Sequence, residues 1–127
     1  MSNSTFVTAI NCMDGRVQLP VIHWMQEKYD APYVDMITEA GPNKVILEGT
    51  DQQIETIKSK LKVSEDAHGS EVLAIVGHHG CAGNPLPKEE KYEKIKESVK
   101  LINTWDFSFK IIGLYVNEDW EVEVVTE

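Results

Sequence analysis

The sequence feature that most constrains the fold is an unbroken apolar run at residues 72–76, which reads Val-Leu-Ala-Ile-Val. Successive side chains of a strand point to opposite faces of its sheet, so this run is apolar on both faces. Such a strand needs other elements to cover both faces, as in the middle of a parallel sheet. We therefore expect a central parallel strand at residues 71–76, with helices packed on both sides of its sheet.

The apolar pattern of the remaining chain alternates between the two-residue period of strands and the 3.6-residue period of helices. It predicts further strands at residues 5–11, 33–37, 110–116 and 120–125, and helices at 19–29, 51–63 and 88–103. In the last strand Trp120, Val122 and Val124 alternate with two glutamates, which is typical of an edge strand with one buried face. We therefore predict an α/β fold: a mostly parallel open sheet of about five strands, with helices on both faces and an antiparallel C-terminal edge strand.

The core-facing side of two helices can be predicted from apolar side chains that recur every three or four residues. The predicted stripes are Leu19, Ile22, Met25 and Tyr29 in the first helix, and Tyr92, Ile95, Val99 and Ile102 in the last.

Length and charge narrow the classes of protein to consider. At 127 residues and 42% hydrophobic, the chain can bury one core, so we expect a single domain over residues 1–127. The net charge of -9 argues against nucleic acid or an anionic membrane surface as partner. No run approaches the roughly 20 apolar residues that cross a bilayer, and residues 1–5 lack the basic and then apolar pattern of an export signal. We expect a cytoplasmic protein with no membrane partner.

Each cysteine of the chain lies in a short stretch that follows a predicted strand. Cys12 begins the stretch Cys-Met-Asp-Gly-Arg, and Cys81 lies in the stretch Gly-His-His-Gly-Cys-Ala-Gly at residues 77–83. Ligands of open parallel sheets gather at the carboxyl ends of the strands. Thiolate and imidazole are the ligands that zinc prefers, and three of them leave a fourth position for a water, a carboxylate or a substrate. Cys12, His78 and Cys81 are therefore candidate zinc ligands.

Two other interpretations of the cysteines remain open. Buried cysteines can act simply as small apolar side chains, and two cysteines can form a disulfide. A metal site is favoured because both cysteines lie in polar, glycine-rich segments and because the chain has no export pattern. The glycines around His78 and Cys81 also allow the tight turn that would bring both side chains to one ion.

The motifs as a whole resemble those of the β-class carbonic anhydrases, zinc enzymes that interconvert carbon dioxide and bicarbonate. Cys-x-Asp-x-Arg follows the first strand, and Gly-His-x-x-Cys-x-Gly follows a later one. Residues 37–43, Ile-Thr-Glu-Ala-Gly-Pro-Asn, resemble a segment in which that family usually has Arg-Asn-Ala-Gly. The resemblance implies zinc bound by Cys12, His78 and Cys81, a catalytic pair of Asp14 and Arg16, carbon dioxide and bicarbonate as the small-molecule substrates, and a homodimer or higher homo-oligomer.

The chemistry of Asp14 and Arg16 fits this implied role. In an extended or turning loop Asp14 lies on the same side as Cys12, two residues earlier. Its carboxylate can accept a hydrogen bond from a zinc-bound hydroxide, or it can bind the metal and close the site. A guanidinium at Arg16 favours the first outcome because it pairs with the carboxylate and keeps it ionised. The alternative is an exposed Asp-Gly turn whose ion pair contributes about 0–1 kcal/mol and has no chemical role.

The resulting prediction is a carbonic anhydrase-like lyase that hydrates carbon dioxide through zinc-bound hydroxide. His79, next to a predicted ligand, can relay the proton that the reaction releases. Two alternatives use the same three ligands: a zinc hydrolase of carbonyl sulfide or carbon disulfide, and a non-catalytic zinc protein in which Asp14 completes the coordination shell.

Overall fold

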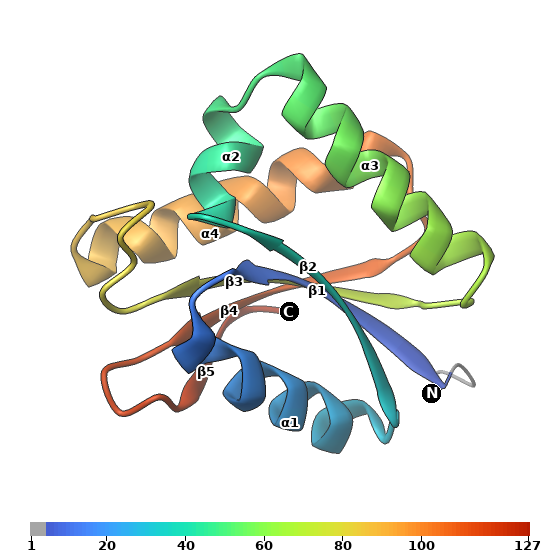
Figure 1. Cartoon of the computed structure of the whole chain (residues 1–127), viewed down its shortest axis with the longest axis horizontal. Helices are drawn as coiled ribbons and strands as arrows, with labels where there is room; N and C mark the ends of the chain where they lie inside the picture. The colour runs from blue at the N-terminus through green and yellow to red at the C-terminus, as the bar shows by residue number, and fades with distance from the viewer. Residues whose placement is uncertain (1–4) are drawn as a thin grey trace.

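A five-stranded sheet in the order β2-β1-β3-β4-β5 forms the middle layer of the computed structural model, which describes residues 5–127 (Figure 1). The strands are β1 (Phe6–Cys12), β2 (Tyr33–Glu39), β3 (Val72–His78), β4 (Lys110–Val116) and β5 (Val122–Thr126). The first four run parallel, and β5 runs antiparallel to β4. The predicted sheet with its antiparallel C-terminal edge strand is confirmed. The prediction that residues 1–5 lack an export signal falls mostly on residues 1–4, which lie outside the described residues.

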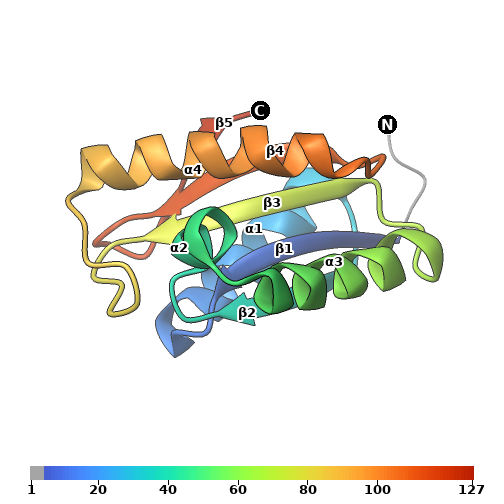
Figure 2. The ribbon, with the colours of Figure 1, turned by 90° about the horizontal axis from the view of Figure 1, so that it is seen from above.

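Helices cover both faces of the sheet, as predicted. Helix α1 (Gln18–Tyr29) packs on one face (Figure 1). Helices α2 (Pro42–Glu48), α3 (Asp51–Asp66) and α4 (Lys88–Ile102) pack together on the other face (Figure 2). Two short 3₁₀ helices, η1 (Gly15–Val17) and η2 (Asn103–Trp105), follow β1 and α4. Within residues 5–127, none of the helices combines the length and the apolar character that crossing a bilayer requires.

Strand β3 is buried along its whole length, which is what its apolar run predicts. Val72, Ala74 and Val76 belong to the apolar cluster that includes the buried residues of α1. Leu73 and Ile75 belong to the opposite cluster, which includes residues of α3 and α4. The strand therefore joins two cores, and its carboxyl end is held rigidly from both sides.

Local chemistry sets two helix starts. The hydroxyl of Thr50 accepts a hydrogen bond from the Gln53 N–H, and the Gln53 side chain accepts one from the Thr50 N–H, so α3 begins with a capping box. Helix α2 begins at Pro42, whose fixed φ suits a first turn, directly after Gly41 at φ 73°. The sequence prediction lacks α2, because seven residues are too few to show a helical period.

Three details of the sequence prediction are wrong. Leu19 was expected to face the core, but it is 61% exposed, and Val21 and Met25 are the buried residues of α1. Val124 was expected on the buried face of the last strand, but it is 42% exposed. Glu123 was expected in water, yet it is half-buried and accepts hydrogen bonds from Tyr92, Asn117 and Lys88. An irregularity in the β4–β5 pairing at Gly113 and Leu114 shifts the register of this edge.

Candidate metal centre

The order of the strands brings the two predicted motifs together. Strands β1 and β3 are parallel neighbours, with Thr8 opposite Leu73 and Ile10 opposite Ile75. The chain leaves β1 toward β2 on one side and leaves β3 toward β4 on the other, so the β1–β3 boundary is a topological switch point. Open α/β sheets bind ligands at such points. Cys12 is the last residue of β1 and His78 is the last residue of β3, so both lie at this edge.

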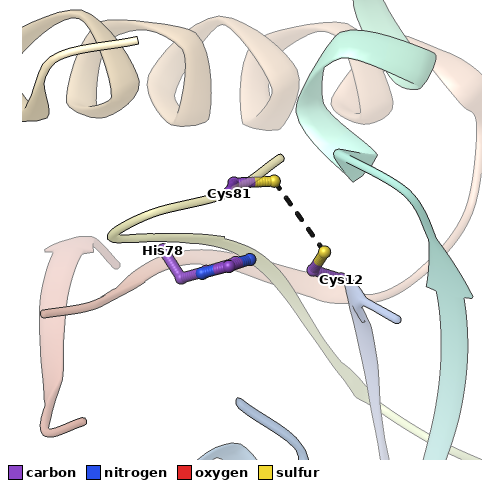
Figure 3. A group of neighbouring side chains, drawn as sticks. All are labelled: Cys12, His78 and Cys81. Carbon is purple, nitrogen blue, oxygen red and sulfur yellow. Dashed lines mark hydrogen bonds between the residues drawn. The ribbon is translucent and has the colours of Figure 1, made fainter. Parts of the chain in front are cut away.

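Cys81 reaches the same place from the turn that follows β3 (Figure 3). This turn needs glycine at two positions. Gly80 has a φ of 69°, a left-handed conformation that glycine adopts at little cost. At Gly83 a Cβ would lie 2.6 Å from the carbonyl carbon of Ala40, so only a residue without a side chain allows this close packing of backbones. Gly80 therefore allows the bend of the Cys81 turn, and Gly83 packs that turn against the segment before α2.

The three donor side chains converge on one point. One ligand atom from each of Cys12, His78 and Cys81 lies within 4.8 Å of the other two, and all three residues are buried. The two Sγ atoms are 3.8 Å apart (Figure 3). Two sulfurs each about 2.3 Å from a tetrahedral ion are about 3.8 Å apart, so the observed spacing fits zinc. A disulfide needs about 2.05 Å, and both cysteines are free thiols.

His78 presents its Nε2 atom to this point. The Nδ1–H donates a hydrogen bond to the backbone carbonyl of His79 at 2.7 Å, which leaves the lone pair on Nε2. Nε2 is buried and has no hydrogen-bond partner among residues 5–127. Burial lowers the pKa of His78, so the imidazole is neutral, which is the form that binds metals. A buried nitrogen without a partner is costly, and a metal ion would satisfy it.

The raised pKa of the Cys81 thiol is consistent with a site that binds a cation. Burial and the neighbouring Cys12 raise the pKa of the Cys81 thiol. Without a cation the thiol proton is therefore held firmly. A divalent ion displaces such protons because thiolate is the ligand form. The donor set, the sulfur spacing and the unpartnered Nε2 together fit a zinc ion.

Asp14 and Arg16 form a closed ion pair beside this cluster. Arg16 Nη2 donates to Asp14 Oδ2 at 2.6 Å, Nε donates to Oδ1 at 3.0 Å, and the backbone N–H of Arg16 donates to Oδ1 at 2.9 Å. These hydrogen bonds hold the pKa of Asp14 well below its usual range. Among residues 5–127, the group of potential ligand atoms that lie together contains no carboxylate. Asp14 is therefore oriented by Arg16.

The guanidinium of Arg16 is itself held in place by two other segments. Its Cζ lies 4.7 Å from the ring centroid of Trp120, in the turn before β5. Its Nη2 lies 3.4 Å from the carbonyl oxygen of Gly80, in the Cys81 turn. The pair thus links the end of β1 with the C-terminal hairpin and with the turn that carries Cys81.

Sequence reasoning missed two buried polar residues at the site. The ammonium of Lys91, on α4, donates to the backbone carbonyl of His78 at 2.6 Å. The amide of Asn43, on α2, donates to the carbonyl of Val76 at 3.1 Å, and its Oδ1 is buried without a partner within the described part of the chain. Lys91 lies four residues before Ile95, on the same helix face, and this spacing was the signal that could have found it.

Two cavities border the ligands. A small one of about 10 Å³, the size of one water molecule, is lined by His78, Cys81, Asn43 and Lys91 among others. A wider pocket of about 500 Å³ opens beside Cys81, His79 and Tyr115. The exposed His79 therefore lines a wide pocket next to a candidate ligand.

The chain matches a known protein family. A family model described as "Putative carbonic anhydrase" matches residues 2–126, which is nearly the whole chain. No curated protein matches the chain.

Proposed function

The chain belongs to the "Putative carbonic anhydrase" family, and from this membership we propose that it is a zinc-dependent lyase that reversibly hydrates carbon dioxide to bicarbonate. The observation that carries the proposal is the convergence of Cys12, His78 and Cys81, with sulfurs 3.8 Å apart and a buried Nε2 that lacks a partner among residues 5–127. When bound, zinc supplies a nucleophile at neutral pH by lowering the pKa of a water in its fourth coordination position to about 7.

Asp14 orients that water in the proposed mechanism. A carboxylate with a strongly lowered pKa is ionised at neutral pH, so it can only accept a hydrogen bond. With zinc bound, Asp14 would accept a hydrogen bond from that water and so orient it toward carbon dioxide, while the proton itself would leave by another route. Arg16 occupies both carboxylate oxygens and keeps Asp14 from becoming a fourth ligand. The pairing therefore favours an open, catalytic site over the non-catalytic alternative.

His79 carries the released proton to solvent in this proposal. Its imidazole is exposed and borders the wide pocket beside Cys81, while its backbone N–H is fixed by the carbonyl of Val116 at 2.8 Å. Histidine side chains serve as proton shuttles, so His79 can pass the proton to buffer.

Three broader features of the protein remain proposals. We propose a homodimer or higher homo-oligomer, a cytoplasmic location and a single domain over residues 1–127. The exposed side chains of Met13 and Leu19, which flank η1, support an interface near the site. Light scattering on the purified, metal-loaded protein tests the oligomer.

The decisive experiment combines a metal assay with stopped-flow carbon dioxide hydration. We expect one zinc per chain, and we expect Cys12→Ser and Asp14→Ala to abolish catalysis. Glu27→Ala removes an exposed carboxylate of α1 and serves as the matched control. Zinc bound at full stoichiometry without turnover would instead identify a structural zinc protein, and turnover of carbonyl sulfide or carbon disulfide alone would identify the related hydrolase.

A further inference from the structure

Among residues 5–127, Lys91 is the one Asp, Glu, Lys or Arg residue that is buried. It is 4% exposed, although it lies on α4, whose other lysines reach solvent to a greater extent. A buried ammonium loses its hydration, and this loss is unfavourable unless nearby groups compensate it. The position of Lys91 therefore calls for a negative partner.

The structure offers no carboxylate for this purpose. Within residues 5–127, no Asp or Glu oxygen lies within ion-pair distance of Lys91. The partner of its Nζ is the His78 carbonyl, at 2.6 Å. Burial lowers the pKa of Lys91 overall, and the sulfurs of Cys81 and Cys12 act in the opposite direction by favouring its charged form. Cys81 also lines both cavities that Lys91 borders.

These sulfurs can compensate the ammonium only when they are thiolates, because a thiol is neutral. Metal binding makes them thiolates. Two thiolates, a neutral imidazole and a divalent cation sum to zero charge, and any anion in the fourth position makes the site negative. A fixed positive charge beside Cys81 would then lower the energy of the loaded site relative to the empty one.

We propose that Lys91 is a positioning residue of the metal centre, which fixes the His78 carbonyl at the end of β3 and stabilises the thiolates of Cys81 and Cys12 by its positive charge. This inference rests on the proposed metal centre. It assigns to α4 a role in metal affinity, through a residue that lies 13 positions beyond His78.

The test compares Lys91→Met with Lys94→Met. Methionine keeps the length of the side chain and removes the charge, and Lys94, on the same helix, is 39% exposed and paired with Glu97 at 3.4 Å. Both variants change the net charge equally. Zinc affinity of the folded, metal-free proteins is measured by competition with a chromophoric chelator. We expect affinity to fall about 10- to 100-fold for Lys91→Met, as for other groups that support metal ligands, and to stay within about twofold for Lys94→Met.

A spectrum of the cobalt-loaded proteins separates charge from packing. Loss of a positive charge near sulfur raises the energy of the sulfur electrons, so the thiolate-to-cobalt charge-transfer band of Lys91→Met should move to longer wavelength. Weaker binding with an unmoved band would mean that Lys91 acts through packing alone, and it would overturn the electrostatic role. Lys91→Gln, which keeps a hydrogen-bond donor without the charge, provides the same comparison if Lys91→Met does not fold.

The outcomes for the two proposals are distinguishable. If the wild-type protein binds no zinc, the proposed function fails before Lys91 is tested. If the wild-type protein binds zinc and a folded, uncharged Lys91 variant binds it equally well, only the inference about Lys91 is overturned.

Discussion

Substitution of Gly83 by alanine should disrupt the metal site from a distance of two residues. A Cβ at this position would lie 2.6 Å from the carbonyl carbon of Ala40, 2.7 Å from its oxygen and 2.8 Å from the Gly41 nitrogen. All three atoms belong to the backbone, so no side chain can rotate away. Ordinary contact begins at 3.4 Å, so the two segments must separate by 0.8 Å relative to the 2.6 Å contact.

This displacement is large relative to the tolerance of a metal site, because metal–ligand distances vary by only about 0.2 Å. The displaced turn carries Cys81, whose Sγ lies 3.8 Å from that of Cys12 in the undisturbed site. We therefore expect zinc affinity to fall at least about tenfold, which corresponds to about 1.4 kcal/mol. The crowding itself should lower the free energy of unfolding by about 1–3 kcal/mol.

The assay is chelator competition at fixed pH on the folded variant, with thermal unfolding of the metal-free protein as the measure of stability. Gly15→Ala is the matched control, because a Cβ at Gly15 meets no heavy atom within 4 Å. It should bind zinc like the wild type. A folded Gly83→Ala protein with wild-type affinity would refute the argument that close backbone packing positions Cys81.

Three further predictions concern the site and its surroundings. Arg16→Ala should let the pKa of Asp14 rise toward its usual range. A carboxyl whose pKa is lower in the folded state than in the unfolded state stabilises the fold at pH values above the unfolded-state pKa, so the variant should be less stable than the wild type at pH 6, and the difference should shrink below about pH 4. Equal differences in thermal unfolding at pH 6 and below pH 4 would contradict this. Chelation of zinc should lower the melting temperature by several degrees, because a ligand at about 1,000 times its dissociation constant stabilises the folded protein by about 4 kcal/mol. Equal melting temperatures of the loaded and the chelated protein in calorimetry would contradict this prediction. His79→Ala should slow carbon dioxide hydration at low buffer concentration and be rescued by high buffer; unchanged turnover at every buffer concentration would eliminate the proton relay.

Much of the fold could be predicted from local patterns. The apolar run of β3 indicates a strand covered on both faces, and β3 is buried throughout. Periodicity also located the three longer helices, with ends within three residues of those observed. Such patterns are informative because each element records, in its own side chains, which of its faces is buried. They fail for α2, which is too short to show a period, and for β5, where hydrogen bonds from Tyr92, Asn117 and Lys88 hold Glu123 in a half-buried position.

The candidate site divides in the same way. The sequence by itself determined the donor types, their placement after strands and the proximity of Asp14 to Cys12. Only the tertiary structure decided that β1 lies beside β3, that Nε2 of His78 faces the sulfurs, that Trp120 stacks on Arg16, and that Lys91 is buried against the His78 carbonyl. The physical reason is that local spacing constrains residues a few positions apart, whereas contacts between distant segments depend on how the faces of whole elements pack together.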